Sequence, residues 1–73
     1  TALSRHQEAL KAYDSATRLD PRFTQAWING GNALARLGRL SEAATRYEEA
    51  LKSAPNDASA RQNLEQVQRV FKR

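Results

Sequence analysis

The chain has no cysteine and a single histidine among its 73 residues. Disulfide bridges and cysteine zinc sites are therefore excluded, and His6 alone cannot build a metal site. No apolar run approaches the ~20 residues of a membrane-spanning helix. Neither a signal-peptide pattern nor an Asn-x-Ser/Thr acceptor occurs. The default expectation is a cytoplasmic protein.

Glycine and proline are also few, with three and two occurrences. Alanine, leucine, glutamate, glutamine and arginine dominate, which favours helix along most of the chain. Pro21 and Pro55 interrupt the helical pattern, and Gly38 marks an internal turn. Ser41 and Asp57 are expected to cap the helices that follow them. The sequence thus predicts an all-α chain with four helical segments, at about 7–20, on either side of Gly38 within 24–54, and at 58–71.

The excess of basic residues is mild, with a net charge of +4. It is strongest near the end, where Arg61, Arg69, Lys72 and Arg73 accompany the single acid Glu65. Such a surface attracts phosphates, so nucleic-acid binding through the last helix is the alternative function. No aromatic residues are interleaved with these charges for base stacking, which disfavours it.

The chain repeats itself after 34 residues. When residues 1–23 are laid on 35–57, seven of the 23 aligned positions are identical in one register. The matching positions are Leu3, Arg5, Glu8, Ala9, Tyr13, Ala16 and Pro21, which correspond to Leu37, Arg39, Glu42, Ala43, Tyr47, Ala50 and Pro55. A period of this length in a helical chain indicates an α-solenoid.

Residues 24–57 resemble a tetratricopeptide repeat, whose pattern is W-x2-L-G-x2-Y, then A-x3-F, then P. The slots are filled by Trp27, Gly31, Leu34 in place of Tyr, Ala43, Tyr47, Ala50 and Pro55. One departure is Gly30, where the pattern has leucine. The resemblance implies antiparallel helix-turn-helix repeats in a right-handed superhelix. It also implies a partial repeat at 1–23, a full repeat at 24–57 and a capping helix at 58–73.

Two adjacent glycines, Gly30 and Gly31, lie in the middle of a predicted helix. Each costs roughly 1 kcal/mol relative to alanine there. The resemblance places Gly31 opposite Ala43 of the following helix, where a larger side chain would push the two helices apart. For Gly30 two interpretations stay open: relief of crowding beside Trp27, or a tolerated weak position.

The beginning of the chain resembles the end of a repeat's first helix. Residues 1–6, His6 included, are expected to form that end and a turn, so the chain is interpreted as a piece of a longer protein. The helix from Gln7 would then lack a partner. Leu10 and its neighbours would be partly uncovered, which predicts weak self-association.

Members of the family resembled line a concave groove with the first helix of each repeat. The resemblance therefore implies a groove for a partner protein or peptide. It would be lined by Gln25, Ile28, Asn29, Asn32, Arg36, Ser59, Gln62, Asn63, Gln66 and Arg69. Asn29 and Asn63 are one repeat apart and could contact the main chain of an extended peptide. Ile28, Ser59 and Asn63 occupy slots where a carboxylate-clamping subclass has lysine or arginine, so that specificity is not expected.

Catalysis is not predicted. The acidic residues are spread along helix exteriors, whereas acid–base chemistry needs ionisable groups gathered in a dry pocket. The stretch "NGGNA" has neither the spacing nor the lysine of a phosphate-binding loop. We expect no catalytic residue, no metal and no cofactor.

Overall fold

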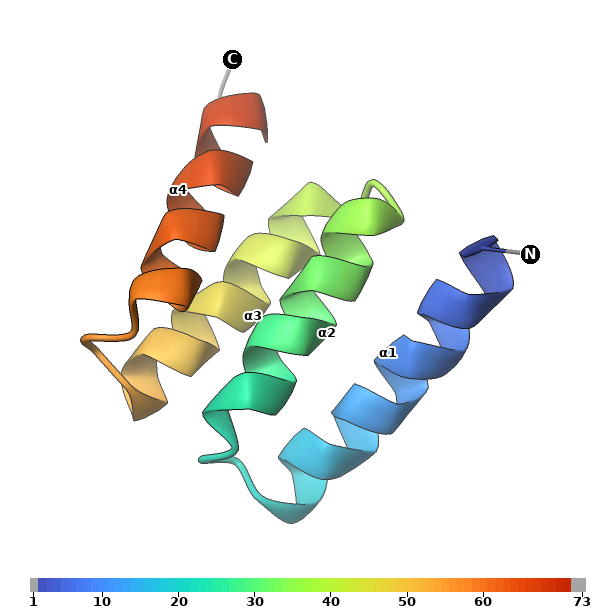
Figure 1. Ribbon diagram of the computed structural model, residues 1–73, viewed down its shortest axis with the longest axis horizontal. Helices are drawn as coiled ribbons and strands as arrows, with labels where there is room; N and C mark the ends of the chain where they lie inside the picture. The colour runs from blue at the N-terminus through green and yellow to red at the C-terminus, as the bar shows by residue number, and fades with distance from the viewer. Residues whose placement is uncertain (1, 72–73) are drawn as a thin grey trace.

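The computed structural model describes residues 2–71, apart from the side chains of Leu3 and Phe71. It contains four helices, α1 (Ala2–Leu19), α2 (Thr24–Arg36), α3 (Leu40–Ser53) and α4 (Ala58–Phe71), joined by short turns. In Figure 1, α1 and α4 lie on opposite sides, with α2 and α3 between them. The predicted all-α fold is confirmed.

Each helix packs mainly against its neighbours along the chain. The helix α2 contacts α1 and α3, α3 also contacts α4, and a smaller contact joins α2 to α4. This sequential packing is characteristic of solenoids. It places α2 and α4 next to each other on one side of α3.

The 34-residue period is visible in the hydrogen bonds of the two turns that contain proline. In the first turn, Phe23 N donates to Asp20 O at 3.0 Å. In the second, Asp57 N donates to Ala54 O, also at 3.0 Å. Donor and acceptor of the second bond each lie 34 positions after those of the first, so the two turns make the same backbone hydrogen bond.

In each of these turns, a side chain donates a hydrogen bond to the carbonyl oxygen of the proline. The indole Nε1 of Trp27 donates to Pro21 O at 2.8 Å. One repeat later, Arg61 Nη2 donates to Pro55 O at 3.0 Å. Arg61 therefore takes the place of the signature tryptophan by making the same hydrogen bond with a different group.

The turn between α2 and α3 depends on Gly38, which has φ of +80°. Arg39 N donates to Leu34 O and Gly38 N to Ala35 O, the pair of bonds that ends a helix with a left-handed glycine. Ser4 stands at the equivalent position one repeat earlier and is helical. The predicted turn at residues 1–6 is therefore wrong from Ala2 onward, because the glycine it would need is absent; Thr1 lies outside the described residues.

The two predicted helix caps have different outcomes. Asp57 Oδ1 accepts a hydrogen bond from Ala60 N at 2.9 Å, so Asp57 is confirmed as the cap of α4. Ser41 is not a cap, because α3 already begins at Leu40. The flanking Arg39 makes no capping bond and instead forms an ion pair with Glu42.

The core lies between the helices and includes most of the signature positions. Leu34 and Tyr47 are its largest fully buried side chains. The small residues Ala43, Ala50 and Ala60 are completely buried. Small side chains at these positions allow the helices to approach closely.

The closest group to Gly31 is the ring of Tyr47. A Cβ atom on Gly31 would lie 2.5 Å from Cε1 and 2.8 Å from Cδ1 of the Tyr47 ring. The opposing group is therefore a whole aromatic ring. The predicted contact of Gly31 with Ala43 thus leaves out the group that a side chain at Gly31 would meet first, the Tyr47 ring.

Gly30 has room for a side chain. Its nearest groups are Arg46 Nη1 at 3.5 Å and Tyr13 Cβ at 3.6 Å, both ordinary van der Waals distances, and Trp27 is not among the nearest three. Crowding beside Trp27 therefore does not explain Gly30. The second interpretation, a tolerated weak position, fits these distances.

The first helix is held against the rest of the chain. Leu10 is 9% exposed and belongs to the core, so the expectation that it would be uncovered is wrong, and the reason given for self-association is removed. An ion pair between Asp14 and Arg46 ties α1 to α3. The Arg46 guanidinium also lies 5.6 Å from the centre of the Trp27 ring, within the range of a cation–π interaction.

Candidate binding groove

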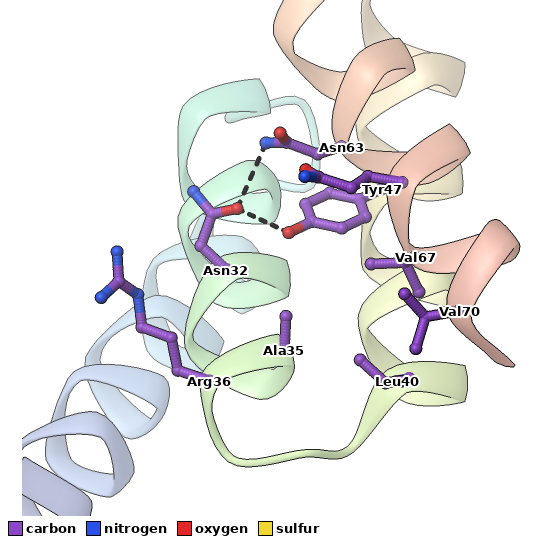
Figure 2. A pocket seen from close by; sticks show the side chains of 9 residues that line it. Asn32, Ala35, Arg36, Leu40, Tyr47, Asn63, Val67 and Val70 are labelled. Atoms are coloured by element: carbon purple, nitrogen blue, oxygen red, sulfur yellow. Dashed lines mark hydrogen bonds between the residues drawn. The ribbon is translucent and has the colours of Figure 1, made fainter.

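A groove of about 570 Å³ opens between α2 and α4, with α3 beneath it. We call it the main groove. Its polar lining residues are Asn32, Arg36, Asn63 and Gln66, and the others are Ala35, Leu40, Tyr47, Val67 and Val70. Figure 2 shows the Tyr47 ring between the two walls, with Arg36 and Val70 on opposite sides. Asn32 and Asn63 lie at one end of the groove, and Leu40 and Val70 lie at the other (Figure 2).

A hydrogen-bond network joins the three helices at the polar end. Asn32 Oδ1 accepts from the Tyr47 hydroxyl at 2.5 Å and from Asn63 Nδ2 at 3.2 Å (Figure 2). The three residues come from α2, α3 and α4 respectively. The network fixes the two walls relative to the floor, so this end of the groove is preorganised.

The electrostatic character of the main groove is set by Arg36. Its lining contains no acidic residue, and among the described residues Arg36 has no ion-pair partner. Burial raises the pKa of Tyr47, and the Arg36 guanidinium opposes this by lowering it. The phenol is therefore neutral at physiological pH, and the positive charge of Arg36 is balanced by no acidic side chain in the groove lining.

A smaller groove of about 280 Å³ lies between α1 and α2. It is lined by His6, Ala9, Tyr13, Asn29, Asn32, Ala33 and Arg36. Six of these residues have their repeat equivalents in the main groove, namely Leu40, Tyr47, Asn63, Gln66, Val67 and Val70. The two grooves are thus the same site one repeat apart. Asn32 and Arg36 line both.

Comparison with known proteins decides the family, because residues 2–58 match the family model described as tetratricopeptide repeat. The chain belongs to the tetratricopeptide repeat family. Repeats of this family generally mediate protein–protein interactions. The resemblance seen at 24–57 therefore extends over most of the chain.

Three longer proteins contain a region similar to this tetratricopeptide chain. Protein O-mannosyl-transferase TMTC1 of Mus musculus is 35% identical over 66 residues, which is 90% of this chain and 7% of that protein. The human TMTC2 is 34% identical over 70 residues, or 96% and 8% of the two chains. The Heat shock protein sti1 homolog of Schizosaccharomyces pombe is 36% identical over 63 residues, or 86% and 11%. The chain therefore spans about a tenth or less of these relatives.

The structure brings only some of the predicted groove residues together. Asn32, Arg36, Asn63 and Gln66 line the main groove, whereas Asn29 lines the smaller one. Ile28 is 3% exposed and belongs to the core, so its side chain has almost no surface to offer a ligand. This removes Ile28 from the proposed groove.

The remaining predicted residues lie outside the two grooves. Gln25 is exposed on α2 and donates from Nε2 to Asn29 Oδ1 at 3.0 Å. Ser59, Gln62 and Arg69 are exposed on α4. Gln62 and Arg69 line a shallow hollow of about 260 Å³ together with Glu65 and Gln66.

Sequence reasoning missed the apolar part of the main groove. Tyr47 was expected only as a structural residue, and Leu40 and Val70 were not considered as site residues. The family resemblance directed attention to first helices, whereas Leu40 and Tyr47 come from α3. The signal was available in the 34-residue shift, because Val70 and Arg36 occupy equivalent positions with opposite chemistry.

Within the described residues, no group of three or more His, Cys, Asp or Glu side chains is placed to hold a metal ion. The same part of the chain contains no helix both long and apolar enough to cross a membrane.

Proposed function

We propose that the chain is a non-catalytic interaction module that binds a peptide segment of a partner protein in the main groove. The observation that carries the proposal is the groove itself, in which an apolar end and an amide-rich end share one floor. A peptide offers both kinds of group, apolar side chains and main-chain hydrogen-bonding groups. Tetratricopeptide repeats in general bind protein partners.

The apolar end supplies the part of the binding energy that depends on burial. Val70 is 55% exposed and Leu40 is half-buried, so both keep surface that a ligand could cover. Covering apolar surface contributes about 25 cal/mol per Å². Because the groove is small compared with a standard protein interface, we expect weak binding by the isolated chain.

At the amide-rich end, the asparagine side chains can orient the main chain of a bound peptide. Asn63 donates an amide hydrogen to Asn32, and no side chain among the described residues donates to its Oδ1, so this oxygen can accept from a ligand N–H. Asn29, its equivalent, lies in the smaller groove and accepts from Gln25. A peptide that contacts both asparagines would span both grooves, which share Asn32 and Arg36 as lining residues.

The first experiment is a display selection of peptides on the chain, followed by titration of the best binder. Val70→Gln should weaken binding by about 1 kcal/mol, because it replaces apolar contact surface with an amide. The matched control is Leu19→Gln, since Leu19 is 87% exposed and lies outside both grooves. Equal affinity of the Val70→Gln variant and the wild type would contradict binding in the main groove.

A second variant tests the asparagines. The Asn29→Ala, Asn63→Ala double variant should lose about 1–3 kcal/mol of binding free energy. Thermal melting must accompany this titration, because Asn63 also donates to Asn32. Unchanged affinity would remove the asparagines from the binding mechanism.

The alternative function, nucleic-acid binding through α4, finds less support in the structure. One N–H of the exposed Arg61 guanidinium donates to the Pro55 carbonyl, and Arg69 lines the shallow hollow together with the acidic Glu65. Lys72 and Arg73 lie outside the described residues. Titration with a mixed oligonucleotide at two salt concentrations tests it, since phosphate-driven binding falls steeply with salt.

A further inference from the structure

The equivalence of the two grooves shows which positions distinguish them. Two positions change from a polar residue in the smaller groove to an apolar one in the main groove, and a third changes from alanine to the larger valine. They are His6 to Leu40, Ala33 to Val67 and Arg36 to Val70. The tyrosine of the floor and the asparagine of the wall are the same in both, Tyr13 and Asn29 against Tyr47 and Asn63. The tyrosine and the asparagine are thus repeated, whereas the lining at the other three positions differs between the two grooves.

Arg36 lies at the boundary between the two grooves and contributes to both. Its side chain is exposed at the end of α2, and no acidic residue lines either groove. The acids Asp14, Glu42 and Glu49 are instead committed to Arg46, Arg39 and Lys52. Among the described residues, no acidic side chain forms an ion pair with Arg36, so its guanidinium can pair with a carboxylate of a ligand.

The exposed apolar surface of the main groove lies largely on the wall formed by α4. Val70 and Val67 of α4 lie on the wall opposite Arg36, and Leu40 lies at the same end (Figure 2). An apolar side chain seated against Leu40 and Val70 would place the peptide beside α2, where Arg36 lines both grooves. A carboxylate a residue or two away along the peptide could then reach Arg36.

The geometry points to a ligand of defined chemistry: an internal peptide segment with an aliphatic or aromatic side chain at the apolar end and an Asp or Glu one or two residues away, paired with Arg36. This inference rests on the proposed function, because it specifies the ligand of the same groove. We assign the carboxylate to a side chain rather than to a peptide terminus. Arg36 lies between two equivalent grooves, so a peptide running along both has its middle there.

The test is three parallel selections from one library of randomised peptides, flanked on both sides by fixed Gly-Ser segments. The targets are the wild type, the Arg36→Glu variant and the Arg22→Glu variant as a charge-matched control. Arg22 is exposed in the first turn and lines neither groove. Thermal melting of all three proteins verifies that they are folded.

We expect the wild type and Arg22→Glu to enrich Asp or Glu within two positions of Leu, Ile, Val or Phe. Arg36→Glu should enrich Lys or Arg at that same offset and retain the apolar residue. Arg36→Gln should weaken a wild-type-selected peptide up to about fivefold at moderate salt. Enrichment of the same acidic peptides by Arg36→Glu would overturn the inference.

Two further readouts separate the ways in which the idea can fail. A selected peptide should bind equally well with a free and an amidated C-terminus, and binding that requires the free terminus overturns the side-chain assignment. If peptides lose affinity with Val70→Gln but show no acidic preference, the groove binds peptides and only the inference about Arg36 fails. If no peptide is sensitive to Val70→Gln, the proposed function itself fails.

Discussion

At the scale of single residues, Tyr47 connects the packing of the repeat with its candidate site. The edge of its ring fills the space left by Gly31, and its hydroxyl donates to Asn32 at the amide-rich end of the groove. Tyr47 is only 2% exposed, so its position is fixed by the core. Any change that moves this ring moves the floor of the main groove as well.

The two adjacent glycines should respond in opposite ways to alanine. Gly31→Ala should destabilise the fold by about 1–3 kcal/mol, because its Cβ overlaps the Tyr47 ring. Gly30→Ala should be neutral or stabilising by up to about 1 kcal/mol, because its Cβ meets its neighbours at ordinary distances. Paired urea denaturation measures both. A larger loss for Gly30→Ala would reverse the assignment.

Tyr47→Phe should cost about 0.5–1.5 kcal/mol at neutral pH, because it removes the hydrogen bond to Asn32. Its pH dependence is also predictable. Burial raises the pKa of Tyr47 in the folded state, so above about pH 10 the unfolded chain loses the proton first. Wild-type stability should therefore fall as pH rises from about 10 toward the raised pKa, and the part due to this residue should be missing in Tyr47→Phe. Parallel alkaline slopes for both proteins would contradict this.

Residue-level prediction from the sequence was accurate where spacing alone decided the outcome. The tetratricopeptide pattern places Trp27 and Gly31 in one helix, as the structure has them. The 34-residue shift makes Asn63 the equivalent of Asn29, and the two line equivalent grooves. Ile28 was misassigned because a position on a helix face does not reveal that the neighbouring helix covers it. Arg61 shows the converse: its pairing with Pro55 could have been anticipated, since Trp27 and Pro21 are the same pair 34 residues earlier.

At the scale of helices, the ends are determined by single residues at the turns. A left-handed glycine at Gly38 ends α2, and the side chain of Asp57 begins α4. The sequence gives no comparable stop signal at Ser4, and α1 continues through it. The helical segments could be predicted from composition and repeats, whereas the beginning of α1 required attention to the missing glycine.

The caps provide a direct test at this scale. Asp57→Ala should destabilise the chain by about 0.5–2 kcal/mol, because Ala60 N loses its acceptor. Ser41→Ala should change stability by less than about 0.5 kcal/mol, since Ser41 lies inside α3 and caps nothing. Thermal melts of the two variants under one buffer condition make the comparison. Equal losses would show that Asp57 contributes no more than an ordinary surface residue.

At the scale of the whole molecule, stability is distributed along the order of the helices. The central helices α2 and α3 each pack against helices on both sides, whereas α1 packs mainly on α2. Because repeats contact mainly their neighbours, local opening can begin at one end without disrupting the rest. The main groove is built from α2, α3 and α4, so it lies away from the first turns of α1.

Amide hydrogen exchange should therefore follow the helix order. We expect the slowest exchange in α2 and α3, and the fastest helical exchange in the first two turns of α1, where Ala2, Ser4, Arg5, Gln7 and Glu8 are exposed. The destabilising Gly31→Ala variant adds a second measurement. It should reduce protection of α2 and α3 by the amount that denaturation reports and leave the first turns of α1 unchanged, because those amides exchange by local opening. Uniform protection across all four helices, reduced equally by Gly31→Ala, would show that the chain opens only as a whole.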